Sequence, residues 1–122
     1  MQKTSDIIWQ DTQHQMLFRL LDEVAAENSA EAVLHQLNFY AESHFSLEET
    51  YMELLNYPGQ QQHVQAHDKF RGELQQMIAS CTGSHDAVSR QLISTFLREW
   101  LKRHIFGIDK ELEAFLLANN IN

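Results

Sequence analysis

Histidine and carboxylate side chains at helical spacing are the residues of this sequence that could carry chemistry. His44 and Glu48 are four residues apart, and so are His63 and His67, so each pair lies on one face of a helix. Both pairs continue rows of apolar side chains, which places them on inward-facing sides. Burying such groups without partners costs roughly 2 kcal/mol or more each. A metal ion bound by imidazole nitrogens and carboxylate oxygens would remove that cost.

Two other segments place a histidine in an apolar row. His14 lies one turn before the apolar pair at 17–18, and His104 continues a row that begins at Ile93. His35 lies off the inward row of its segment and His85 lies in a turn, so we interpret both as ordinary surface histidines. The metal prediction therefore rests on five of the seven histidines.

Asp109 follows His104 by five residues, where the other steps of its row are three or four. In a regular helix that step turns the side chain by about 140°, away from the face of the histidine. We expect a π-bulge to restore the alignment, with Gly107 making the irregular backbone easier. In the alternative, Ile108 continues the row and Asp109 is solvated.

The number and type of these side chains restrict which metal could bind and how many ions the site could hold. Imidazole and carboxylate ligands without thiolate suit iron, and also zinc, manganese or copper. Seven ligands are too many for one tetrahedral zinc ion, but they suit two ions if both carboxylates bridge them.

Four periodic segments must position these side chains. We expect helices at about 12–27, 30–56 and 61–81, and a fourth that reaches about residue 118. Asp11 is the expected N-cap of the first helix, Tyr57-Pro58-Gly59 ends the second, and Ser84 or Asp86 is the expected cap of the fourth. Because the connections are short, neighbouring helices must run antiparallel. The predicted fold is an all-α, up-down-up-down antiparallel four-helix bundle with the metal site in its core, as one domain over residues 1–122.

Composition excludes several classes of partner. A net charge of −8 argues against nucleic acid, which needs clustered lysine and arginine. A single cysteine, Cys81, cannot form an intramolecular disulfide. We find no apolar run long enough for a signal peptide or a membrane span. We therefore expect a cytoplasmic protein with no membrane partner and an unknown oligomeric state.

Four motifs resemble the hemerythrin family, in particular its bacterial branch. They are D-T-Q-H-Q-M-L-F at 11–18, H-F-S-L-E-E at 44–49, H-V-Q-A-H at 63–67 and W-L-K-R-H-I-F-G-I-D at 100–109. Each motif alone is weak, but the four occur in the order of the family, with compatible spacing, over nearly the whole chain.

The resemblance implies a role for each residue. His63, His67 and His104 would bind one iron ion, and His14 and His44 a second ion with one open position. Glu48 and Asp109 would bridge the two ions together with an oxo or hydroxo group. The ligand pocket would be walled by Phe45, Trp100, Leu101 and Ile105.

The function implied by the resemblance is reversible dioxygen binding, as a carrier or store, without enzymatic turnover. One alternative is an oxygen- or redox-sensing input domain fused or bound to a signalling protein, such as a diguanylate cyclase or chemoreceptor. Detoxification of nitric oxide or peroxide at the same diiron site is a less favoured alternative.

The segment before Asp11 departs from the bacterial pattern, because only ten residues precede it where a longer arm is usual. We expect Ile7, Ile8 and Trp9 to pack as a short cover. A thinner cover admits solvent, so the oxygenated protein should autoxidise faster than long-armed relatives. The measurement is the decay of its absorption band, and a lifetime of many hours would contradict the expectation.

Overall fold

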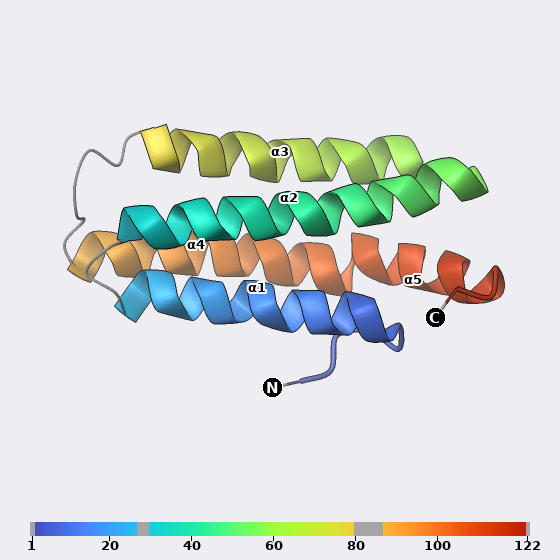
Figure 1. The fold of residues 1–122 in the computed structure, drawn as a ribbon, viewed down its shortest axis with the longest axis horizontal. Helices are drawn as coiled ribbons and strands as arrows, with labels where there is room; N and C mark the ends of the chain where they lie inside the picture. The colour runs from blue at the N-terminus through green and yellow to red at the C-terminus, as the bar shows by residue number, and fades with distance from the viewer. Residues whose placement is uncertain (1, 27–29, 80–86, 122) are drawn as a thin grey trace.

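The computed structural model describes residues 2–26, 30–79 and 87–121 and contains no strand within them. Its helices are α1 (Ile8–Ala26), α2 (Ala30–Leu55), α3 (Gln60–Ala79), α4 (Ala87–Phe106) and α5 (Ile108–Ala118). In Figure 1, α1 to α4 run alternately in opposite directions, and α5 continues in the direction of α4. α1 packs beside α2 and α4, and α3 packs beside the same two helices. The predicted all-α antiparallel bundle is confirmed.

The core consists of two apolar clusters. The larger fills the bundle on the side of residues 17–24 of α1, 33–45 of α2 and 97–105 of α4. The smaller packs Ile7 and Met52 against the inner face of α5. The predicted metal ligands fall between these clusters along the helices, so a polar layer is enclosed by hydrocarbon on two sides. No helix among the described residues is long and apolar enough to cross a membrane.

Two helix ends have clear local causes. α2 ends at Leu55 because Asn56 adopts φ 54° and Pro58 follows, as the sequence predicts. α1 begins at Ile8, earlier than predicted, and the Asp11 N–H bonds the carbonyl of Ile7. Asp11 therefore lies inside the first turn, and its prediction as the N-cap is wrong. The expected cap of the fourth helix near residues 84–86 lies outside the described residues.

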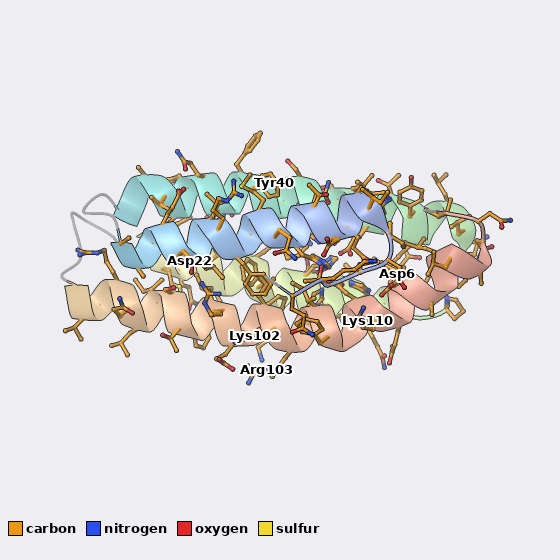
Figure 2. The ribbon with its side chains drawn as sticks, turned by 90° about the horizontal axis from the view of Figure 1, so that it is seen from below. Asp6, Asp22, Tyr40, Lys102, Arg103 and Lys110 are labelled. Atoms are coloured by element: carbon orange, nitrogen blue, oxygen red, sulfur yellow. The ribbon has the colours of Figure 1, made fainter. Side chains whose placement is uncertain are left out.

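The N-terminal segment, residues 2–7, lies along the seam between α1 and the α4–α5 helices, with Asp6 and Lys110 on the same side (Figure 2). The Asp6 N–H donates to Glu113 Oε2 at 2.8 Å, which ties the segment to α5. Ile7 is buried and Trp9 is half-buried, stacked on Tyr51. Ile8 is 77% exposed, so the expectation that it contributes to the cover is wrong.

The fourth helix is interrupted at Gly107, where α4 ends and α5 begins. The Gly107 carbonyl accepts the N–H groups of Lys110 and Glu111 to start α5. The prediction of a π-bulge is wrong, because the chain leaves the helix at one residue instead of widening one turn. The break nevertheless turns Asp109 inward, where it is 2% exposed. Asp109 is therefore not solvated, and Ile108 is half-buried beside it.

Gly107 allows a close approach that another residue would block. A Cβ there would lie 2.7 Å from the carbonyl oxygen of Arg103, a backbone atom that cannot turn away. Gly107→Ala should therefore lower the free energy of unfolding, by about 1–3 kcal/mol. The measurement is urea unfolding of the metal-free protein.

Gly72→Ala is the matched control. Gly72 lies inside α3, and a Cβ there meets nothing within 4 Å. The change should raise stability by about 0.5–1 kcal/mol, because alanine favours the helix. Equal effects of the two substitutions would contradict the proposed role of the close approach at Gly107.

Candidate metal centre

The Asp109 carboxylate lies among three imidazole rings. Its Oδ1 is 2.9 Å from His63 Nε2 and 3.0 Å from His104 Nε2, and its Oδ2 is 3.0 Å from His14 Nε2. The three rings come from α1, α3 and α4, so this single side chain joins three helices. Each Asp109 oxygen faces a different set of histidines, which is the disposition of a carboxylate that spans two neighbouring positions.

The Glu48 carboxylate lies among three histidine nitrogens, one of which, His63 Nε2, also lies beside Asp109. Its Oε1 is 3.2 Å from His67 Nε2, 3.5 Å from His44 Nε2 and 3.6 Å from His63 Nε2. All seven predicted ligands thus converge, and none is more than 4% exposed. They come from every helix of the bundle.

Most of the converging atoms have no hydrogen-bond partner among the described residues. These atoms are the Nε2 atoms of His14, His63, His67 and His104, Oε1 of Glu48 and both oxygens of Asp109. These atoms lie close to one another, but none of them makes a hydrogen bond of acceptable geometry. The atoms face a common centre instead of each other. Such orphaned buried groups need a ligand, and neutral nitrogen with anionic oxygen is a donor set for a borderline transition metal.

The donor atoms form two overlapping groups. One is Glu48, His63, His67, His104 and Asp109, and the other is His14, His44, Glu48 and Asp109. Within each group one ligand atom per residue lies within 4.8 Å of all the others. The groups share only the two carboxylates. This is the division that the family resemblance implies.

The seven residues also lie within a region that matches a known family. The hemerythrin HHE cation-binding domain family matches residues 6–116, which is most of the chain. The chain belongs to the hemerythrin family. That membership supports oxygen binding at non-haem iron in general terms.

Relatives among curated proteins include two myohemerythrins. The one from Sipunculus nudus is 31% identical over 100 residues, covering 81% of this chain and 76% of the relative. The one from Riftia pachyptila is 29% identical over 99 residues, with the same coverage of both chains. A hemerythrin-like protein of Naegleria gruberi is 28% identical over 104 residues, covering 85% and 80%. No solved structure matches the chain at a significant level.

In this hemerythrin-family site, outer hydrogen bonds orient three imidazoles. His14 Nδ1 lies 2.9 Å from Thr4 Oγ1, whose own hydrogen goes to Asp11 Oδ1 at 2.8 Å. The Thr4 oxygen must therefore accept from His14, which leaves the Nε2 lone pair facing the cluster. His44 Nδ1 is bound in the same way by Gln13 Oε1. Such partners fix the tautomer of a metal-binding histidine.

The third outer hydrogen bond joins an imidazole to a carboxylate. His67 Nδ1 lies 2.8 Å from Glu49 Oε2, and Arg71 pairs with the same carboxylate at 3.0 Å. Thr4, Gln13 and Glu49 were not predicted from the sequence to be part of the site. The only indication in the sequence was that Gln13 and Glu49 are each adjacent to a predicted ligand.

Two of the four expected pocket residues stack on histidine rings of the cluster. Phe45 stacks on His67 with ring centroids 3.9 Å apart, and Trp100 stacks on His104 at 4.7 Å. Leu101 and Ile105 are buried in the same core cluster as Phe45. Whether these four residues contact a bound ligand stays a prediction.

Proximity of opposite charges sets the protonation of the metal-free site. Burial acts to raise the pKa of the Asp109 and Glu48 carboxyls, but the adjacent histidines outweigh it and lower both. Burial lowers the pKa of His44 to about 4. Burial also opposes the charge on His63, but the Asp109 and Glu48 carboxylates outweigh it and raise its pKa to about 9. At neutral pH the metal-free site thus holds two carboxylates and a protonated His63.

This protonation predicts a pH dependence for the metal-free protein. Because the folded pKa of His63 exceeds the unfolded value of about 6.5, its contribution to stability is complete below that pH. The contribution is lost as pH rises through about 9. Urea unfolding of the wild type and of His63→Gln from pH 6 to pH 9.5 should show a steeper decline for the wild type. Parallel declines would contradict the pKa assigned to His63.

Proposed function

We propose that this protein binds dioxygen reversibly at two iron ions held by the seven buried side chains, as an oxygen carrier or store. The observation that carries the proposal is the pair of donor groups that share Glu48 and Asp109. When bound, two neighbouring iron ions supply the reversible transfer of two electrons to dioxygen. The proposal assigns His63, His67 and His104 to one ion, and His14 and His44 to the other.

The composition of the groups supports iron and an open position. One group offers three imidazoles and two carboxylates, and the other offers two imidazoles and the same two carboxylates. The second group has one donor fewer, so an ion there would have room for a small external ligand. Five neutral imidazoles with two carboxylates give the ions less anionic donation than a carboxylate-rich site. That balance favours binding and release over oxidation of a substrate.

The apolar side chains around the seven residues support a role in excluding water from a bound ligand. The two apolar clusters lie on either side of the polar layer, and Phe45 and Trp100 cover two histidine rings. Bulk water and anions compete with dioxygen for an open position, so their exclusion lengthens the life of the oxygenated state. The side chains contribute this exclusion, the ligand geometry and the tautomers of His14 and His44.

The test begins with iron loading under anaerobic conditions. The wild type should hold two iron ions per chain, develop a visible absorption band in oxygen and lose it when oxygen is removed. Asp109→Ala and Glu48→Ala should each retain less iron and show no reversible band. His35→Gln is the matched control, because His35 is exposed and outside the cluster, and it should behave as the wild type.

Three results would contradict the proposal. One is a single iron ion in the wild type, and another is a band that persists after oxygen is removed. The third is steady turnover of nitric oxide or peroxide with a reductant, which would assign the same site to detoxification.

A further inference from the structure

Gln10 is a buried polar residue that lies outside the seven proposed ligands. It is 0% exposed, and its Nε2 donates to Glu48 Oε2 at 2.8 Å. The other oxygen of the same carboxylate faces the histidines. Gln10 and His14 are four residues apart on α1, so Gln10 occupies the next inward position of the same row.

The N-terminal segment fixes Gln10 in turn. Ser5 Oγ donates to Gln10 Oε1 at 2.6 Å, and Ser5 Oγ accepts the Ile7 N–H at 3.0 Å. The hydrogen of Ser5 is thus directed to Gln10, and the amide of Gln10 is directed to Glu48. The reverse amide orientation would place a carbonyl oxygen against the ionised Glu48, which electrostatic repulsion excludes.

All donors in this chain of hydrogen bonds point toward Glu48. Each bond polarises the next, so the Gln10 N–H becomes a stronger donor than an isolated amide. A donor directed at a metal-binding carboxylate withdraws electron density from it. An iron ion bound to a less basic carboxylate is stabilised in its reduced state.

We propose that Gln10 is a positioning residue that orients Glu48 and, with Ser5, raises the reduction potential of the iron pair. This inference rests on the proposed function. It gives the buried glutamine a role in keeping the ions reduced, which is the state that takes up dioxygen.

A second hydrogen bond from the same segment has the opposite polarity. The Nδ1–H of His14 donates to Thr4, which donates to Asp11. This pair of hydrogen bonds draws the Nδ1 proton away from the imidazole and makes His14 a stronger electron donor. A stronger donor favours the oxidised state of the iron ions. Thr4 and Gln10 therefore provide matched substitutions with predicted effects of opposite sign.

The experiment measures the midpoint potential of the iron-loaded protein by spectroelectrochemistry. Gln10→Met removes the donor at similar length and should shift the potential to more negative values. Ser5→Ala keeps Gln10 but removes its polarising partner, and should give a smaller shift of the same sign. Thr4→Val should shift the potential to more positive values. Gln75→Met removes a glutamine hydrogen bond to Asn38 at the exposed surface and should leave the potential unchanged.

Shifts of the midpoint potential with opposite signs in Gln10→Met and Thr4→Val support the proposal. A general loosening of the N-terminal segment would instead shift the potentials of both variants in one direction. Shifts of the same sign overturn it, and so does an unchanged potential in Gln10→Met with two iron ions bound. If Gln10→Met does not fold, Ser5→Ala decides the question, and an unchanged or positive shift overturns the proposal.

Iron is counted in the wild type first. Fewer than two ions there would overturn the proposed function, and with it the role of Gln10. Two ions in every variant with no difference in potential would overturn the role of Gln10 alone.

Discussion

The structure depends on the need to satisfy seven buried polar side chains at one place. An isolated buried imidazole or carboxylate is costly, and here the groups lie between two apolar clusters with at most 4% of any residue exposed to solvent. The helices solve this by directing the groups to a common centre, so the packing of the bundle and the chemistry of the site share one geometry. A cation at that centre satisfies several orphaned atoms at once, which ties its affinity to the stability of the folded bundle.

The sequence predicted the fold and the convergence of the inward rows because both follow from helical periodicity. The two residues of each pair, His44 with Glu48 and His63 with His67, are four positions apart. That they share one helix face can therefore be predicted without tertiary information. Asp109 was harder, because its position depends on how the backbone absorbs one residue. A π-bulge and a break at Gly107 both turn it inward, and periodicity cannot choose between them.

The rest could not be predicted because it depends on contacts between distant segments. The Gln10 to Glu48 bond joins residues 38 positions apart, and no local pattern indicates which glutamine will be buried. The start of α1 was misplaced for a related reason. Asp11 looks like a cap in isolation, but its carboxylate binds Thr4 from the N-terminal segment. The family resemblance predicts the ligands, whereas the outer hydrogen bonds emerge only from the three-dimensional structure.

The N-terminal segment reaches α5, where the Asp6 N–H donates to Glu113 across a separation of 107 residues. The site itself closes a comparably long loop, because His14 of α1 meets Asp109 of α5, and the entropic cost of closure grows only slowly with loop length. Thr4 and Ser5, by contrast, bond to residues of α1 no more than ten positions away. The N-terminal segment and α1 thus form one local unit that carries the outer hydrogen bonds of His14 and Gln10, and this unit completes the site when α1 packs against α2 and α4.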